Sequence, residues 1–263
     1  MASLQGKYIV ITGASGGIGK ALALEVAKRG AIPVLMARSL DKLEQVAAQI
    51  KMNYQIEAPF YQLDVRKQGD IEQTFKQLIT AIPAVDVLVN NAGYGKFDDI
   101  ADLSLDDMSG MFEVNVYGLI ACTKMVLPSM IEQNQGHIIN IASQAGKIAT
   151  PKSSVYAATK HAVLGFTNSM RMELYDTNIF VTSVNPGPIR TEFFDIADSS
   201  GSYKQKVDKW MLEPDYVAKR IADAMFTRTR EINLPGWMNM ASKLYQVFPG
   251  VVEKFGGKAF RQK

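Results

Sequence analysis

The chain has 263 residues, of which 47% are hydrophobic and 21% are charged. This length suits one hydrophobic core and is too short for two comfortable domains, so we expect a single domain over residues 1–263. The composition excludes a disordered protein. Lys and Arg total 29 against 26 Asp and Glu, a net charge of +3 without a basic block, which argues against a nucleic-acid-binding protein.

Cysteine usage and apolar runs bear on the compartment. Cys122 is the one cysteine, so it cannot form an internal disulfide, and we interpret it as a packing residue in a reducing compartment. The longest apolar runs, such as residues 31–37, are far shorter than the roughly 18 residues that a membrane span needs. The run "YIVI" leads directly into a glycine-rich turn, unlike a signal peptide. We therefore expect a cytoplasmic protein.

Short β-branched runs alternate with longer segments of helical periodicity, a pattern typical of βαβ units around a parallel sheet. The runs are apolar on both faces, as in sheets that helices cover on both sides. We predict an α/β fold with a doubly wound, seven-stranded parallel sheet. Strands are expected near 8–12, 32–37, 59–65, 85–92, 137–143, 179–186 and 231–235. Helices are expected near 17–29, 40–51, 67–81, 104–134, 154–176 and 214–228.

The first strand and the first helix are joined by "TGASGGIG", which contains Gly13, Gly17 and Gly19. Glycines there allow a tight turn, a close approach of backbone N–H groups to a pyrophosphate, and close packing of the helix on the sheet. The alternative is a structural turn between strand and helix. Because the motif follows the first strand of a βαβ unit, we expect a dinucleotide site that includes Ser15 and Ile18.

The second and third strands carry the residues expected to face the adenosine. Arg38 and Ser39 stand where a ribose-binding carboxylate would select NAD(H), so a 2′-phosphate would meet a guanidinium and a hydroxyl, which favours NADP(H). Alternatively, Arg38 is a solvated residue after a strand. At the end of the third strand, Asp64 and Val65 are placed near the adenine, although Asp64 also suits a turn or a helix N-cap.

The fourth strand ends in "NNAG", Asn90 to Gly93. Consecutive asparagines are poor strand formers, which indicates a specific use. We assign Asn90 to the cofactor cleft and Asn91 mainly to the architecture of the loop. Asn91, Ala92 and Gly93 are also expected along the cofactor.

Tyr156 and Lys160 lie one helical turn apart in "YAATK" and project from the same helix face. An ammonium group beside a phenol stabilises the phenolate, so we expect Lys160 to lower the pKa of Tyr156 and make it a usable proton donor. Ser143 ends the fifth strand and could hydrogen-bond the same substrate oxygen. A chance Tyr–Lys pair is common on helix surfaces, and only the position of this pair after the serine and the glycine motif supports catalysis.

These motifs together resemble the short-chain dehydrogenase/reductase family from Lys7 to about Pro235. The shared segments are "TGASGGIG", "NNAG", Asn115 in "FEVNVYG", Ser143 with "YAATK", and "NPGPIRT" at 185–191. The resemblance implies a Rossmann-like fold, a Ser-Tyr-Lys centre, and a water relay behind Lys160 supported by Asn115, for which helix packing is the alternative role. It also implies cofactor contacts along 186–191, which we assign to Pro186, Gly187, Ile189 and Thr191.

The resemblance implies hydride transfer between a nicotinamide and a carbonyl or secondary alcohol, with carbonyl reduction preferred. Many reductases of the family carry a basic residue where this chain has Gly16, so we expect NADP(H) to be preferred and NAD(H) to be an alternative. A non-catalytic NADP(H) sensor would not need Ser143, Tyr156 and Lys160. An epimerase of the extended type would usually carry a longer C-terminal domain. No metal site is expected, because His137 and His161 lack partners at ligand spacing.

The polar, glycine-containing segment 188–212 is predicted to be a mobile lid over the substrate site. An apolar substrate is suggested by aromatic and apolar side chains at Phe193, Phe194, Trp210, Met211, Tyr94 and Phe97. The tail 236–263 is apolar and basic, and resembles tails of family members that act on lipophilic carbonyls.

The tail's apolar stripe consists of Trp237, Met240, Ala241, Leu244, Phe248, Val251, Val252 and Phe255. We favour core or subunit packing over a pocket lid. A membrane-surface contact aided by Lys243, Lys254, Lys258 and Arg261 is the least favoured alternative. The long helices near 104–134 and 154–176 resemble those that pair subunits in the family, so we expect a homodimer or homotetramer.

Overall fold

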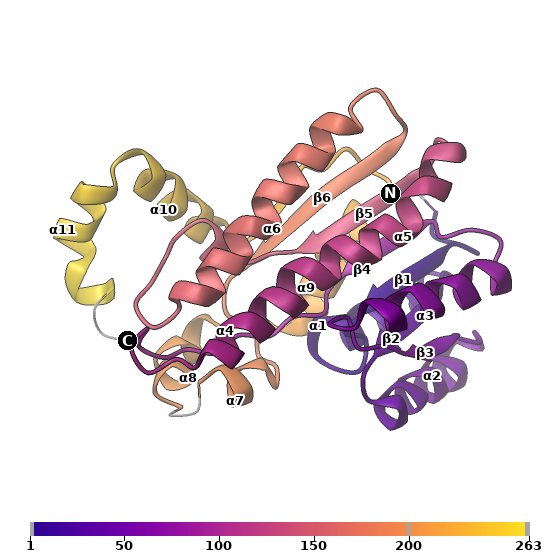
Figure 1. Cartoon of the computed structure of the whole chain (residues 1–263), viewed down its shortest axis with the longest axis horizontal. Helices are drawn as coiled ribbons and strands as arrows, with labels where there is room; N and C mark the ends of the chain where they lie inside the picture. Colours follow the sequence, from indigo (N-terminus) through magenta and orange to yellow (C-terminus); the bar gives the residue numbers. More distant parts are fainter. Residues whose placement is uncertain (1–2, 199–200, 261–263) are drawn as a thin grey trace.

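Seven parallel strands run through the centre of the computed structural model, which describes residues 3–198 and 201–260 (Figure 1). Their order across the sheet is β3-β2-β1-β4-β5-β6-β7. The chain moves outward from β1 to β3 and then returns to the other side of β1, so the order reverses between β1 and β4. In such sheets, ligands bind at the carboxyl ends of the strands beside this reversal. The strands are β1 (Tyr8–Thr12), β2 (Ile32–Ala37), β3 (Phe60–Gln62), β4 (Val87–Asn90), β5 (Gly136–Ile141), β6 (Ile179–Pro186) and β7 (Glu231–Leu234).

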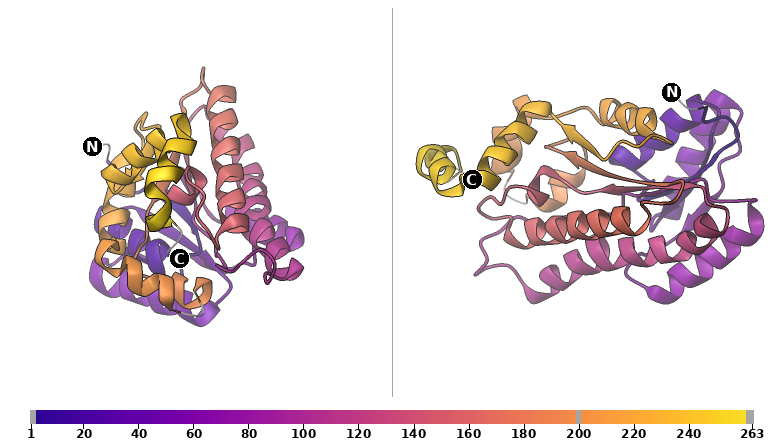
Figure 2. Two further views of the ribbon diagram at one scale, coloured as in Figure 1. Left: turned by 90° about the vertical axis from the view of Figure 1, so that its left-hand side faces the viewer. Right: turned by 90° about the horizontal axis from the view of Figure 1, so that it is seen from above.

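Helices cover both faces of the sheet (Figure 2). One core contains apolar side chains of α1 (Gly17–Lys28), α2 (Leu40–Tyr54) and α9 (Pro214–Ala224). The second core, on the opposite face, contains side chains of α3 (Gln68–Ala81), α5 (Leu119–Glu132) and α6 (Ser154–Glu173). Strand residues such as Ile9 and Val10 alternate between the two cores, which explains why the strands read as apolar on both faces. The predicted doubly wound, seven-stranded parallel sheet is confirmed.

The predicted long helix near 104–134 is interrupted by a change of helix type. α4 (Leu105–Phe112) continues through a π-helical turn, η1 (Glu113–Gly118), into α5. Such a turn carries one extra residue and is frequent at functional sites. Residues 105–132 together are long and apolar enough, by length and composition alone, to cross a membrane, and 44% of their most apolar window is buried inside the protein. The buried core helix of a protein can meet the same criteria, so this stretch is weak evidence for a membrane span, and the expected absence of a membrane-spanning segment stays a prediction.

Two peripheral segments follow the main sheet elements. The segment 188–212 contains α7 (Phe193–Ala197), α8 (Ser202–Val207) and the short 3-10 helix η3 (Asp208–Trp210). After β7, the chain forms α10 (Gly236–Val247) and α11 (Pro249–Phe260), which project from the carboxyl end of the sheet (Figure 1).

The tail stripe is not part of the core. Trp237 is 53% exposed and Met240 is 74% exposed, and Leu244, Phe248 and Val251 are also exposed. Core packing within the chain is therefore excluded for these five side chains. The side chains of Phe255 and Lys258, and the whole of Arg261, lie outside the described residues.

Candidate active site

The glycine loop is held against the end of β4 by close contacts. Gly13 has a φ of +66°, and a Cβ there would lie 2.9 Å from Asn91 Nδ2. Gly17, with a φ of +52°, begins α1, which has no acidic residue in its first turn. A Cβ at Gly19 would collide with the Gly13 carbonyl, so glycine is needed for close packing of α1 on β1. Half-buried Ser15 stands between these glycines, and half-buried Ile18 follows Gly17. The loop presents its backbone and a helix N-terminus, as binding of a pyrophosphate requires.

The ends of β2 and β3 form an exposed, polar edge. Arg38 and Ser39 are both exposed, and the Arg38 carbonyl accepts a hydrogen bond from Gln62 Nε2 at 2.8 Å. Asp64 binds Arg66, whose Nη2 donates to Oδ2 at 2.6 Å. The hydrogen bond from Arg66 holds the pKa of Asp64 below its usual value. Asp64 therefore has the local turn contact that was its alternative role, and the adjacent Val65 is buried.

Asn90, the last residue of β4, and Asn91, the residue after it, have different roles. Asn90 is 2% exposed, and its Nδ2 donates to Thr123 Oγ1 and to Asn140 Oδ1, both at 2.9 Å. Its side chain thus ties β4 to α5 and β5, and its assignment to the cofactor cleft was wrong. Asn91 Nδ2 donates to the Thr12 carbonyl at 2.9 Å and the Gly13 carbonyl at 3.1 Å, which agrees with a role in loop architecture. Ala92 is half-buried and Gly93 is exposed beyond them.

Ser143 and Tyr156 come together beside the end of β5. Ser143 precedes the 3-10 helix η2 (Gln144–Gly146), and its Oγ accepts a hydrogen bond from the Ala145 N–H at 3.0 Å. The same hydroxyl donates to the Pro186 carbonyl at 3.4 Å and lies near enough to Tyr156 to lower the pKa of its phenol. Tyr156 and Lys160 project from the first turns of α6, and both are buried. The three side chains predicted as a centre are thus neighbours.

Burial controls the acidity of this centre. It raises the pKa of Tyr156 to about 12, against the lowering effect of the neighbouring Ser143 hydroxyl. It also lowers the pKa of Lys160 to about 8. Lys160 Nζ lies 5.7 Å from the centre of the Tyr156 ring and donates to the Ile141 carbonyl at 2.9 Å. The predicted lowering of the Tyr156 pKa was wrong in direction, because desolvation of the phenolate outweighs an ammonium group at this distance.

Asn115 lies in the π-helical turn η1 and is 1% exposed. Its Oδ1 accepts from the Tyr94 N–H at 3.0 Å, while its Nδ2 donates to the Tyr94 carbonyl at 2.8 Å and to Thr159 Oγ1 at 3.1 Å. A Cβ added at Gly93 would lie 3.1 Å from Asn115 Oδ1 and 3.6 Å from Lys160 Nζ. Asn115 is therefore close to Lys160, and its amide also fixes the loop that follows "NNAG".

The segment after β6 returns toward the glycine loop. The Gly187 N–H donates to the Leu234 carbonyl at 2.6 Å, which fixes the turn after Pro186 to β7. Ile189 is buried and forms an isolated parallel bridge with Leu212. Thr191 approaches the glycine loop, because a Cβ at Gly17 would lie 3.3 Å from Thr191 Cγ2. The predicted cofactor contacts along 186–191 thus follow one strip from β7 to α1.

Aromatic side chains enclose Tyr156. Its ring centre lies 5.6 Å from that of Phe97 and 5.7 Å from that of Phe193. Phe97 also lies 5.4 Å from the ring of Tyr203, which sequence reasoning did not single out. A Cβ at Gly95 would lie 2.9 Å from Tyr156 Cδ2 and 3.0 Å from Phe193 Cζ, so this glycine permits the approach.

The other aromatic and apolar candidates are distributed unevenly around this group. Tyr94 packs in the same buried cluster, and Phe194 lies 5.4 Å from the ring of Phe193. Trp210 lies outside this group and stacks edge-on with Trp237 of the tail. Met211 follows Trp210 and is half-buried.

Neither histidine is placed for catalysis. The His137 ring is buried between the Phe226 N–H, which donates to its Nδ1, and Thr182 Oγ1, and burial lowers its pKa to about 3. His161 Nδ1 lies 2.8 Å from the Ala157 carbonyl within α6.

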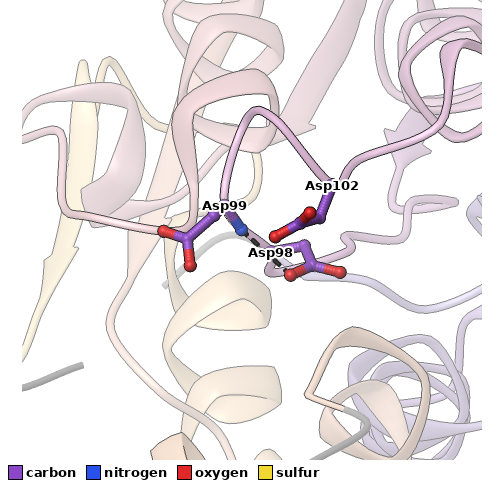
Figure 3. A group of neighbouring side chains, drawn as sticks. All are labelled: Asp98, Asp99 and Asp102. Atoms are coloured by element: carbon purple, nitrogen blue, oxygen red, sulfur yellow. Dashed lines mark hydrogen bonds between the residues drawn. The ribbon is translucent and has the colours of Figure 1, made fainter.

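The carboxylates of Asp98, Asp99 and Asp102 come within 4.8 Å of one another on the loop before α4 (Figure 3). Asp99 and Asp102 are exposed, and Asp99 pairs with Lys152 at 3.3 Å. No residue of the predicted site belongs to this acidic group.

Comparison with known proteins agrees with the fold and the motifs. A family model described as short chain dehydrogenase matches residues 7–200. The chain is 37% identical over 241 residues to the NADP-dependent 3-hydroxy acid dehydrogenase of Schizosaccharomyces pombe. The matched region covers 89% of this chain and 91% of that protein.

Two solved structures extend this comparison. An alcohol dehydrogenase from the archaeon Thermococcus sibiricus, complexed with 5-hydroxy-NADP, is 30% identical with a TM-score of 0.79 and coverage of 88% of this chain and 96% of that one. A short chain dehydrogenase/reductase from Burkholderia phymatum in complex with NAD shares the fold, with a TM-score of 0.87, 24% identity and coverage of 95% and 96%.

Proposed function

Because this chain belongs to the short-chain dehydrogenase/reductase family and is an oxidoreductase, we propose that it reduces apolar carbonyl compounds with NADP(H). The observation that carries the proposal is the enclosure of a protonated Tyr156, which lies beside Ser143, by the rings of Phe97 and Phe193. A site of this kind offers a carbonyl oxygen two hydroxyl groups and offers its substituents an apolar surface.

The residues present fit a dinucleotide. The glycine loop would hold the pyrophosphate, since Gly13 and Gly17 adopt positive φ and a Cβ at Gly19 would fill the space at the turn. Arg38 and Ser39 would bind the 2′-phosphate, which supports NADP(H) over NAD(H). The names of the S. pombe relative and the T. sibiricus complex support the same preference.

The remaining assigned cofactor contacts follow the groove. Asp64 and Val65 would lie at the adenine, Asn91 to Gly93 along the middle, and Pro186, Gly187, Ile189 and Thr191 at the nicotinamide. When bound, the cofactor supplies a hydride.

The reaction that we assign to this chain's residues is proton donation to the developing alkoxide. Ser143 orients the carbonyl oxygen, and Tyr156 donates its phenolic proton to it. The raised pKa of Tyr156 keeps the phenol protonated at neutral pH, as the reducing direction requires. Lys160 contributes positive charge behind the phenol and would hold the ribose hydroxyls of the bound cofactor, and Asn115 would support a water relay behind Lys160.

The aromatic side chains and the lid carry the proposed preference for an apolar substrate. The segment 188–212 supplies Phe193, Phe194 and Tyr203 to the aromatic enclosure, and we assign it the role of a lid. Arg190 ties the start of this segment to Asp208 near its end, at 2.7 Å, and to Glu213 just before α9, at 3.1 Å.

A panel of aldehydes and ketones tests the proposal, with NADPH oxidation followed by absorbance. We expect aromatic and long-chain carbonyls to have a higher kcat/KM than small hydrophilic ketones of equal reactivity. The reverse order would refute the apolar substrate, and no oxidation with any member would refute the reductase activity. Such an outcome would favour a cofactor-binding sensor.

We propose that the protein forms a homodimer or homotetramer, because exposed apolar side chains lie on its long helices. Tyr117 and Ile131 on the long helix, and Met172 and Tyr175 near the end of α6, are exposed. Apolar surface of this kind is typical of subunit contacts. Sedimentation equilibrium tests this assignment, and a monomer at micromolar concentration would contradict it.

For the tail we propose subunit packing of its exposed stripe, with a membrane-surface contact as the alternative that Lys243 and Lys254 support. Liposome flotation of the full chain distinguishes the two, because recovery with anionic vesicles would contradict subunit packing as its role. The buried thiol of Cys122 supports a cytoplasmic location.

A further inference from the structure

Among the described residues, two lysines are buried, Lys160 in the candidate centre and Lys147 outside it. Lys147 follows η2, the turn that begins after Ser143, and its side chain is 9% exposed. A buried ammonium group is costly unless it is paired and hydrogen-bonded. The partners of Lys147 therefore indicate what the residue does.

Lys147 Nζ joins three elements. It donates to Glu231 Oε2 at 2.6 Å and to Asn233 Oδ1 at 2.8 Å on β7, and to Asn239 Oδ1 at 3.3 Å on α10. Burial raises the pKa of Glu231, but the hydrogen bonds from Lys147 and Asn233 outweigh it, so the net shift is downward. The three donated bonds use the full capacity of an ammonium group.

A chain of hydrogen bonds connects this group to the strand that precedes the proposed nicotinamide contacts. Asn185 Nδ2 donates to Asn233 Oδ1 at 2.9 Å, and the Asn185 carbonyl accepts from Gln144 Nε2 at 2.8 Å. The Lys147 N–H donates to the Gln144 carbonyl at 2.9 Å, which closes a ring. Gln144 follows Ser143 and Asn185 precedes Pro186, so the ring fixes the backbone on both sides of the Ser143–Pro186 contact.

The start of α10 rests on the same region. Asn239 accepts from Lys147, and Met238 packs so closely on Gly187 that a Cβ there would lie 2.7 Å from Met238 Sδ. The tail is therefore attached at its first turns to both sides of the candidate centre.

We propose that Lys147 is a positioning residue, which holds the Ser143 hydroxyl and the Pro186–Gly187 backbone in register and through which α10 acts on the reaction. The inference rests on the proposed role of Ser143 and Tyr156 in carbonyl reduction. Errors of about 1 Å in the placement of reacting groups can reduce rates by about 100-fold, so a group that fixes two segments at once affects turnover without contacting substrate.

The test compares Lys147→Met with Lys7→Met. Lys7 pairs with Asp86 at 2.8 Å at the amino ends of β1 and β4, and is a partly exposed Lys–carboxylate pair remote from the centre. We expect Lys147→Met to lower kcat by about 10- to 100-fold with a much smaller change in the Kd for NADPH. Lys7→Met should keep the wild-type kcat. Thermal unfolding of both variants shows what each loses in stability.

Three further measurements separate positioning from general support of the fold. The primary isotope effect with NADPD should rise in Lys147→Met, because misplacement slows the hydride step itself. Lys147→Arg should restore most of kcat, since it keeps the charge and several donors. Asn239→Ala, which removes only the contact from α10, should lower kcat in the same direction by a smaller factor, and it serves as the main test should Lys147→Met not fold.

The inference is overturned if Lys147→Met folds with kcat within twofold of wild type. It is also overturned if Asn239→Ala leaves kcat unchanged when Lys147→Met does not fold, or if the isotope effect does not rise while kcat falls. Failure of the proposed function gives a different pattern, because Tyr156→Phe would then retain the wild-type turnover whatever the Lys147 variants do.

Discussion

The carboxyl edge of the sheet holds charged and titratable groups in two contrasting environments. At the ends of β2 and β3, Arg38 is exposed, and the Asp64–Arg66 pair lies at the surface. At the ends of β4 and β5, burial brings the pKa of Tyr156 to about 12 and that of Lys160 to about 8. Water screens the charges at the exposed ends of β2 and β3, so residues there can select a ligand at little cost to the stability of the fold. At the buried ends of β4 and β5, the protein environment sets the protonation states of Tyr156 and Lys160.

The largest expected effect is at Tyr156, beside the buried ends of β4 and β5. Tyr156→Phe removes the proton donor while it keeps the ring that packs on Phe97 and Phe193. We expect kcat to fall by about 10²- to 10⁴-fold, the usual contribution of a general acid, with NADPH binding retained. Stopped-flow turnover and fluorescence titration of NADPH measure the two quantities. Wild-type kcat in this variant would refute Tyr156 as the acid.

The next largest effect is expected at Arg38, at the exposed end of β2. Arg38→Asp replaces the proposed partner of the 2′-phosphate with a repelling charge. Hydrogen bonds to charged groups contribute about 1.5–3 kcal/mol, so we expect kcat/KM with NADPH to fall by about 10- to 100-fold and the preference to move toward NADH. The melting temperature should stay near that of wild type, because the side chain is exposed. Unchanged kcat/KM values for both cofactors would contradict the assignment.

The pH dependence of activity distinguishes deprotonation of Lys160 from unfolding of the protein. Burial lowers the pKa of Lys160 from 10.5 to about 8, so the folded protein loses this proton before the unfolded chain does. Between these two values the unfolded state binds more protons, and the Lys160 contribution to stability increases as the pH rises. Activity should move the other way, because the positive charge behind the phenol is lost.

Above pH of about 8, kcat/KM for reduction should therefore fall by up to about tenfold per pH unit. The measurement is a pH–rate profile at saturating NADPH, with the melting temperature recorded in the same buffers. A flat profile up to pH 10 would contradict a role for the Lys160 charge.

The smallest expected effect is at Asp64. Its carboxylate is engaged by Arg66, and exposed ion pairs contribute about 0.2–1 kcal/mol, so Asp64→Asn should change the Kd for NADPH by no more than about fivefold. Isothermal titration of both proteins measures this. A much larger loss would show that the proposed Asp64–adenine contact contributes more to binding than the engagement of this carboxylate by Arg66 allows.

The positions of the strands along the chain could be predicted because their sequence signals are local. Residues 8–12, 32–37 and 179–186 were predicted as strands at the bounds observed, since glycine, proline or polar residues mark where each apolar run ends. β3 is shorter than predicted because Leu63, Asp64 and Val65 leave the sheet after pairing with β2 ends at Gln62. The π-helical turn at Asn115 has no sequence signal, because it depends on packing against the loop at Tyr94.

Side-chain direction and burial were the properties that the sequence could not supply. Asn90 turns toward Thr123 and Asn140, although nothing in "NNAG" distinguishes which of its amides faces the groove. The ring of Phe97 comes from a segment far from Tyr156 in the chain, and burial of the Tyr156 phenol reversed the predicted direction of its pKa. Lys147 was not singled out for the same reason, since its partners lie 84 to 92 residues away.

The close approach of Gly95 to Tyr156 and Phe193 restricts how this protein can be altered. Because a Cβ at position 95 would come too close to both rings, this position tolerates no side chain unless the Tyr156 phenol or Phe193 shifts. Attempts to reshape substrate scope should therefore begin at Phe97 or Tyr203, not at position 95. The residue with the smallest side chain beside the phenol is in this respect the least adjustable one.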